Sequence, residues 1–198
     1  MEPEATRGSP PGRHRYPPAS MKVYTRKGDD GTTGLLYGGR VRKDDPAPVA
    51  YGEVDEAQAA IGVARAHAER GGELDELLVS VERDLWVLMA DLATEAANRH
   101  KLTPGATLVT AEMVDRLEQV IDDVSARFEM PSEFVVPGEA PVAAFLDLAR
   151  TVVRRAERHS LAVAAEGSHA LAYLNRLSDL LWTLARWQEG ESLTSRQH

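Results

Sequence analysis

The stretch LDELLVSVERDLWVLMADLATEAANR, residues 74–99, decides the fold of this 198-residue chain. Its apolar side chains recur at alternating spacings of four and three residues, a period that places them on one stripe of an α-helix. The stripe consists of Leu74, Leu78, Val81, Leu85, Leu88 and Leu92. We therefore predict a long amphipathic helix that ends near Arg99.

Four further segments show the same helical period, at about residues 49–68, 113–128, 141–165 and 168–188. Gly71-Gly72, Pro131 and Gly167 stand between helices and favour breaks in the chain's helical structure. Since no strands alternate with these helices, a Rossmann or P-loop sheet is not indicated. Five long helices with short or medium connections predict an all-α fold, a five-helix bundle in the up-and-down style of ferritin-like proteins.

Length and composition predict one domain between two tails. The chain is 43% hydrophobic, which suffices for one domain with a sizeable core. Residues 1–20 contain five prolines and no apolar run, so we expect a disordered N-terminal tail rather than a secretory signal. The helical-bundle domain is then expected at 21–190 and a C-terminal tail at 191–198.

Charge and residue usage exclude several classes of function. With 31 acidic against 23 basic residues the net charge is −8, so nucleic acid is not an expected partner. The chain has no cysteine, which excludes disulfides, thiolate metal sites and a cysteine nucleophile and fits a reducing compartment. No run of about 18 apolar residues is present, so no membrane span is expected. We expect a cytoplasmic protein.

The decamer TRKGDDGTTG, residues 25–34, has the composition of an anion-binding loop. Its glycines expose backbone N–H groups, its threonines add hydroxyl donors, and its basic residues add positive charge. Asp29 or Asp30 could hold Mg²⁺ through water. The decamer matches no named phosphate fingerprint, and two plain turns at a domain edge are the alternative.

The predicted helix over 141–165 carries a cluster of charge on one face. Arg150, Arg154, Glu157 and Arg158 fall at i, i+4, i+7 and i+8, so they lie together, and the arginines repel one another unless an anion lies nearby. The alternative is that acids of neighbouring helices, Asp55 among them, form ordinary ion pairs with this face. The glycine loop and this face together indicate a polyphosphate site.

Six segments, taken in order, resemble the successive motifs of the PduO-type ATP:cob(I)alamin adenosyltransferases, and the resemblance covers about residues 21–190. The segments are Tyr24-Thr25-x-x-Gly28-Asp29-x-Gly31, Lys43-Asp44-Asp45, Tyr51-Gly52-Glu53-Val54-Asp55-Glu56, Phe134-Val135-Val136-Pro137-Gly138, Arg154-Arg155-Ala156-Glu157-Arg158 and Leu174-Asn175-Arg176-Leu177-Ser178-Asp179. Six ordered motifs are far more specific than any one of them.

The resemblance implies a homotrimer with ATP at each subunit interface and the corrinoid beside it. The implied reaction transfers the 5′-deoxyadenosyl group of ATP to the cobalt of cob(I)alamin and releases triphosphate. Because Co(I) is itself a strong nucleophile, no side-chain nucleophile is needed. Mg²⁺ is expected with the ATP phosphates, and no metal ligand of the protein is assigned. An adenosylcobalamin-dependent enzyme is an expected recipient of the product.

The resemblance also implies roles for individual residues. Arg154 is expected to act in catalysis, and Asp55 and Arg150, which the family pairs across the interface, are assigned both to catalysis and to cobalamin. Phe134 matches an aromatic that keeps the lower axial ligand away from cobalt. The residues expected to bind ATP are Thr25, Arg26, Lys27, Gly28, Thr33, Gly34, Lys43, Arg154, Arg155, Glu157, Arg158 and Asn175.

Two features depart from the family pattern. Asp30 stands where many members have lysine, and the link between the fourth and fifth helices is short. Two other classes of function stay open on the residues alone: a different ATP-binding helical phosphohydrolase, which would turn over ATP without a corrinoid, and a non-enzymatic helical interaction protein, in which the glycine loop and the arginine face would be inert.

Overall fold

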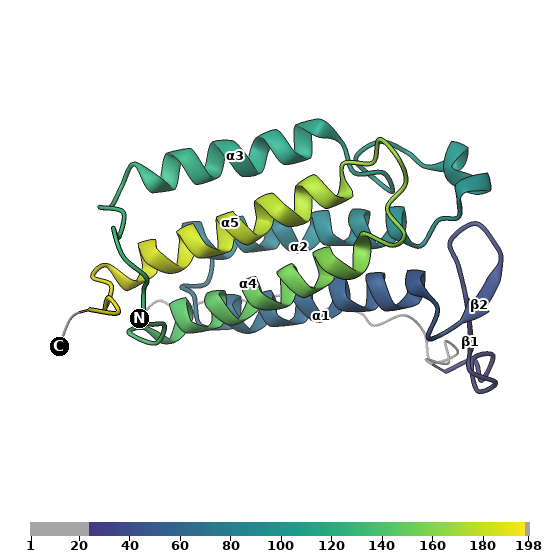
Figure 1. Cartoon of the computed structure of the whole chain (residues 1–198), viewed down its shortest axis with the longest axis horizontal. Helices are drawn as coiled ribbons and strands as arrows, with labels where there is room; N and C mark the ends of the chain where they lie inside the picture. The colour runs from purple at the N-terminus through teal and green to yellow at the C-terminus, as the bar shows by residue number, and fades with distance from the viewer. Residues whose placement is uncertain (1–23, 197–198) are drawn as a thin grey trace, which may run out of the picture.

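Five α-helices lie side by side in the computed structural model, which describes residues 24–196 (Figure 1). The bundle predicted from the sequence is therefore present. A short two-stranded sheet precedes the helices, and one 3₁₀-helix follows the second of them. In chain order the elements are β1 (Thr32–Gly34), β2 (Arg40–Arg42), α1 (Pro46–Ala66), α2 (Glu73–Leu92), η1 (Ala96–Lys101), α3 (Ala111–Ser125), α4 (Pro141–Ser160) and α5 (Ala170–Glu189).

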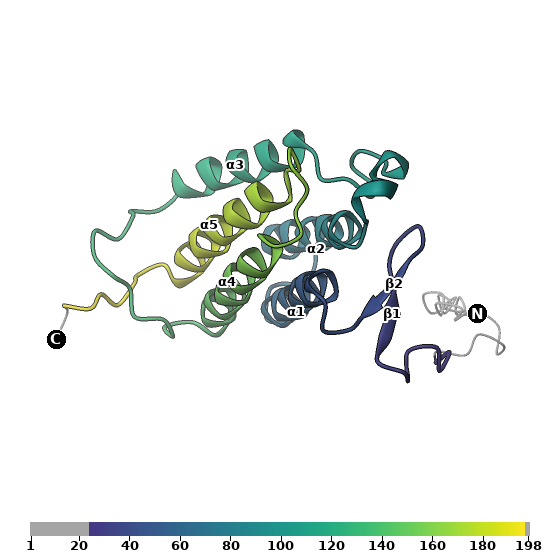
Figure 2. The ribbon, with the colours of Figure 1, turned by 45° about the vertical axis from the view of Figure 1, so that its right-hand side comes forward.

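Helix α4 lies between α1 and α5, while α2 packs on α1 and α3 packs on α5 (Figures 1 and 2). Consecutive helices run in opposite directions, as in an up-and-down bundle (Figure 1). The six apolar residues of the stripe on α2 are all buried, as predicted. No helix in the part of the chain that the structure describes is both long and apolar enough to span a membrane.

Two helices end well before the residues predicted for them. Helix α2 stops at Leu92 instead of near Arg99, because its last stripe residue is Leu92 and the residues after it continue as the separate helix η1. Helix α4 stops at Ser160 instead of Ala165. Beyond Ser160 the chain forms a tight turn, in which the N–H groups of Val163 and Ala164 donate to the Ser160 carbonyl, and Leu161 is 65% exposed.

The glycine-rich segment forms a hairpin that the sequence analysis did not predict. Strands β1 and β2 pair antiparallel, with Thr32 opposite Arg42 and Gly34 opposite Arg40. The turn between them is tied to the end of α2 by the backbone N–H of Leu36, which donates to the carbonyl of Ala93 at 3.0 Å. The hairpin therefore lies at the end of the bundle where α2 ends and α1 begins (Figure 2).

The two predicted tails have different outcomes. The N-terminal tail, residues 1–20, lies outside the described residues. The C-terminal segment is not a detached tail over its described part, because Thr194 forms an antiparallel bridge with Val135 in the connection between α3 and α4. Backbone pairing joins two segments that are about 60 residues apart, which periodicity cannot predict.

We expect Leu88→Ala to destabilise the protein by about 2–5 kcal/mol, because Leu88 is fully buried in the stripe of α2 and truncation leaves a cavity. Leu161→Ala is the matched control, since Leu161 is mostly exposed and its truncation should cost less than about 0.5 kcal/mol. Urea unfolding followed by circular dichroism measures both. Equal destabilisation by the two changes would contradict the proposed core.

Candidate functional site

The loop that precedes β1 is tightly folded around Gly28. The N–H of Gly31 donates to the carbonyl of Gly28 at 3.2 Å, and the N–H of Lys43 donates to the carbonyl of Gly31 at 2.9 Å. A Cβ added at Gly28 would lie 3.1 Å from the carbonyl oxygen of Thr32 and 3.2 Å from Nζ of Lys43. The absence of a side chain at Gly28 thus lets the Lys43 ammonium lie directly against the loop.

Asp30 stabilises this loop from within. Its Oδ1 accepts hydrogen bonds from the N–H of Thr32 at 2.9 Å and from the Thr32 hydroxyl at 2.7 Å. These bonds, the hydroxyl first, lower the pKa of the Asp30 carboxyl below its usual value, with Arg40 adding to the effect at 3.7 Å. Asp30, which stands where many family members have lysine, therefore has a local structural role. Because Asp30 is bonded to Thr32, Asp29 is the better candidate of the two acids for Mg²⁺.

Arg40 belongs to this loop although the sequence analysis did not select it. Its Nη2 donates to the carbonyl of Lys27 at 2.5 Å, and its Nε donates to the Thr32 hydroxyl at 3.1 Å. The alternation of polar and apolar residues in Arg40-Val41-Arg42 was the available signal, because it is typical of a strand that would pair with 32–34.

The basic residues Arg26, Lys27 and Lys43 in and beside this loop are exposed. Among the described residues, neither Lys27 nor Lys43 forms an ion pair, and Arg26 stacks on Tyr24 with its guanidinium 5.5 Å from the ring centroid. Arg26 also has a positive φ of 61°. A group of cations that form no ion pair is suited to binding a polyanion. Thr25, Thr33 and Gly34 lie in the same segment.

On α4, Arg154 is exposed, and within residues 24–196 its guanidinium makes no hydrogen bond or ion pair. Its backbone carbonyl accepts from Nη1 of Arg158 at 2.9 Å. Three residues after Arg154, Glu157 accepts a hydrogen bond from the Asn175 amide of α5 at 3.2 Å. The structure therefore brings Glu157 and Asn175 together, as expected for one pocket, and leaves Arg154 available to a ligand.

Arg155 faces a different direction from Arg154. It forms an ion pair with Glu53 of α1 at 2.5 Å and a second one with Glu56. Hydrogen bonds to these carboxylates raise the pKa of the guanidinium further above its ordinary value. Its charge is neutralised within the chain, so the structure does not place Arg155 with the other residues expected to bind ATP.

Asp55 and Arg150 do not meet within one chain. Arg150 is 28% exposed on α4, and its Nε lies 3.3 Å from Oδ1 of Asp147. Asp55 is exposed on α1, where it has no ion-pair partner among the described residues. A contact between the two would therefore need a second copy of the chain.

Phe134 is 88% exposed, an unusual state for a phenylalanine. It lies in the connection between α3 and α4, residues 126–140, at the end of the bundle remote from β1 and β2 (Figures 1 and 2). One chain thus separates the glycine loop from Phe134 by the length of the bundle. Within residues 24–196 no group of three or more His, Asp or Glu side chains is placed to hold a metal ion.

Comparison with known proteins gives one consistent result. Residues 23–188 match the family described as cobalamin adenosyltransferase. A corrinoid adenosyltransferase of Mycobacterium tuberculosis is 44% identical over 170 residues, which cover 83% of this chain and 87% of that protein. A variant of the PduO-type ATP:corrinoid adenosyltransferase of Lactobacillus reuteri, complexed with cobalamin and ATP, matches with a TM-score of 0.78 at 28% identity, covering 88% of this chain and 97% of that one.

We expect Gly28→Ala to weaken ATP binding by about tenfold, because the added Cβ would contact the Thr32 carbonyl and displace the Lys43 ammonium. Gly62→Ala is the matched control: it makes the same chemical change within α1, where the new Cβ would meet only a flexible Glu82 side chain at 3.4 Å. Isothermal titration calorimetry with ATP measures both. An unchanged dissociation constant for Gly28→Ala would remove this loop from the nucleotide site.

Proposed function

The chain belongs to the cobalamin adenosyltransferase family, and from this membership we propose how its residues carry the reaction. It is an ATP:corrinoid adenosyltransferase that forms adenosylcobalamin. In the proposed step the electron pair of Co(I) attacks the ribose C5′ of ATP. A Co–C bond forms, the C5′–O bond breaks, and triphosphate leaves with the bonding electrons. The chain's own residues position ATP and stabilise the leaving group.

The observation that carries the proposal is the contrast between paired and unpaired cations. Arg155 is neutralised by two carboxylates, whereas Arg154 and Lys43 form no ion pair among the described residues. A cation that has no carboxylate partner in the chain remains available to an anionic ligand. The leaving triphosphate is such an anion, and its charge on the departing oxygen grows as the C5′–O bond breaks. We assign the triphosphate to the glycine loop and Arg154.

We propose that the complete site forms between two copies of the chain. Helix α4 has 20 residues and so spans roughly 30 Å, which separates the loop at one end of the bundle from Phe134 near the other. One chain cannot place both against the same pair of substrates. A head-to-tail contact between copies can do so, and three copies that close a ring give the homotrimer. The exposure of Asp55 and Phe134 supports such a contact.

In this arrangement Phe134 faces the corrinoid. An apolar ring below the cobalt has no atom that can coordinate it and leaves no room for the lower axial ligand. Removal of that ligand leaves a four-coordinate centre, which is easier to reduce to Co(I). Mg²⁺ would take its ligands from the ATP phosphates, and Asp29, which lies within the loop, would bind it through water.

The direct test mixes the protein anaerobically with ATP and cob(I)alamin and follows the corrinoid absorbance. Formation of adenosylcobalamin with one triphosphate per turnover supports the proposal. ATP hydrolysis that does not need the corrinoid would instead favour the phosphohydrolase. If the protein neither forms product nor binds ATP, the result would favour a non-enzymatic interaction protein.

We expect Arg154→Ala to lower kcat by about 10²–10³-fold, the range seen when one group that stabilises developing charge is removed. The fold should be unaffected, because the Arg154 side chain is exposed. Arg127→Ala is the control for loss of an exposed arginine, since Arg127 pairs with Glu73 on the surface. Near-normal adenosylation by a folded Arg154→Ala protein would remove this arginine from catalysis.

A double-mutant cycle tests the pairing of Asp55 with Arg150 between chains. We expect each single alanine variant to raise the KM for cob(I)alamin or to weaken the trimer, with a coupling of about 0.5–3 kcal/mol between them. Arg150 keeps Asp147 as a partner within its own chain, so Asp55→Ala should be the milder change. Steady-state kinetics and analytical ultracentrifugation provide the values. Strict additivity with an unchanged trimer would show that the two residues do not meet.

A further inference from the structure

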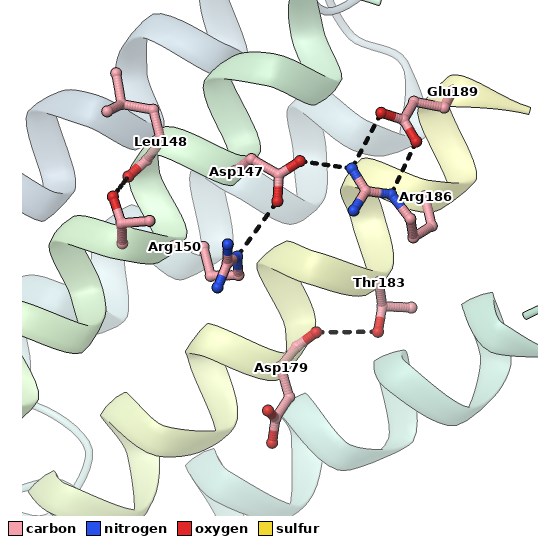
Figure 3. A network of polar contacts seen from close by, with 8 residues as sticks. Asp147, Leu148, Arg150, Asp179, Thr183, Arg186 and Glu189 are labelled. Atoms are coloured by element: carbon pink, nitrogen blue, oxygen red, sulfur yellow. Dashed lines mark hydrogen bonds and ion pairs between the residues drawn. The ribbon is translucent and has the colours of Figure 1, made fainter. Parts of the chain in front are cut away.

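A buried charge network lies between α4 and α5 (Figure 3). The Arg186 side chain is only 2% exposed, and its Nη2 donates to Oδ2 of Asp147 at 2.5 Å and to Oε1 of Glu189 at 3.1 Å. The Glu189 side chain is fully buried. A buried arginine held by two carboxylates fixes the positions of all three side chains, because leaving any of them unpaired would be costly.

The network continues to Arg150. The second oxygen of Asp147, Oδ1, lies 3.3 Å from Nε of Arg150, so this one carboxylate holds both arginines (Figure 3). Two arginines and two acids give the group no net charge. The carboxylate of Asp147 therefore sets where Arg150 lies on α4.

In the other direction the network reaches the C-terminal segment. The hydroxyl of Ser192 donates to Oε2 of Glu189 at 2.9 Å. Immediately after Ser192 the chain pairs with the segment of Phe134: the N–H of Val136 donates to the carbonyl of Leu193, and the N–H of Ser195 donates to the carbonyl of Phe134, both at 2.8 Å.

Besides these backbone bonds, the Glu133 carboxylate next to Phe134 forms an ion pair with Arg196 of the C-terminal segment at 3.6 Å. The Phe134 ring is almost fully exposed and so is not anchored in the core. A cavity of about 670 Å³ lies beside the bridge, lined by residues 129–132, 139 and 190–194. Backbone bonds and this ion pair therefore join the segment of Phe134 to the C-terminal segment, and Ser192 connects that segment to the buried network.

We propose that Asp147, Glu189 and Ser192 are positioning residues for the corrinoid side of the site. Asp147 fixes Arg150, while Glu189 and Ser192 fix the C-terminal segment that holds Phe134. The buried charge network thereby fixes the positions of both Arg150 and Phe134, the two residues assigned to cobalamin, although they lie 16 positions apart and on different elements. The inference rests on the proposed function, because it assumes that Arg150 and Phe134 face the corrinoid.

The test compares Ser192→Ala and Glu189→Gln with two controls in the full-length protein. Ser192→Thr keeps the hydroxyl, and Glu118→Gln removes an exposed Glu–Arg176 pair that also involves α5. Hydrogen exchange at the amides of Val136 and Ser195 reports the bridge without any need for activity. Steady-state kinetics give the KM values for cob(I)alamin and ATP, and the Co(II) spectrum in the ATP complex reports the four-coordinate fraction.

We expect both amides to exchange roughly fivefold faster in Ser192→Ala and Glu189→Gln, the factor that corresponds to one lost hydrogen bond. The KM for cob(I)alamin should rise by about threefold or more and the four-coordinate fraction should fall, while the KM for ATP stays within about twofold. Ser192→Thr and Glu118→Gln should behave like the wild type.

Different outcomes separate the two claims. A wild-type protein that forms no adenosylcobalamin overturns the proposed function. An active wild type whose Ser192→Ala variant shows unchanged exchange and an unchanged KM for cob(I)alamin overturns the positioning role alone. Parallel rises in both KM values would show a general structural effect, which also contradicts it. Because Ser192 lies outside the buried core, its variant remains informative even where Glu189→Gln fails to fold.

Discussion

The packing of α4 against α1 is the contact on which the rest of the structure depends. Both helices bury small residues at this contact, and small side chains allow the two helix axes to approach closely. Burial of this face also fixes which faces of α4 remain for charge. The arginine side chains of α4 can therefore lie only on the sides of the helix that do not face α1. In this way the packing of the core determines where these cations lie. The buried small residues are Ala50, Ala57 and Ala64 of α1 and Ala143, Ala149 and Ala156 of α4.

Three arginines of this scaffold have different roles because their surroundings differ. Arg186 lies in the core, where two carboxylates hold it. Arg155 ties α4 to α1 through ion pairs at the surface. Arg154, beside Arg155 in sequence, is 100° away on the helix and keeps its charge for a ligand. A guanidinium is always charged, so its role is decided by whether the fold supplies an anion or leaves that to a substrate.

The hairpin and Phe134 show how the bundle sets the geometry of the reaction. The hairpin is tied to the end of α2, and Phe134 is held by the C-terminal segment at the other end. A rigid antiparallel bundle keeps its two ends apart, and this separation is the basis of our proposal that the triphosphate and corrinoid sides of one site come from two copies of the chain.

The sequence by itself determined the helices, their number and the buried stripe of α2, because helical period and apolar burial are local properties. It also identified the family, since ordered motifs are readable without coordinates, and it predicted Arg154 and the glycine loop as site residues. Only the tertiary structure decided that Arg155 is neutralised by α1, that Asp30 and Arg40 build the loop, and that the C-terminal segment pairs with Phe134. Each of these depends on contacts between residues distant in the chain, and such contacts leave no period in a single sequence.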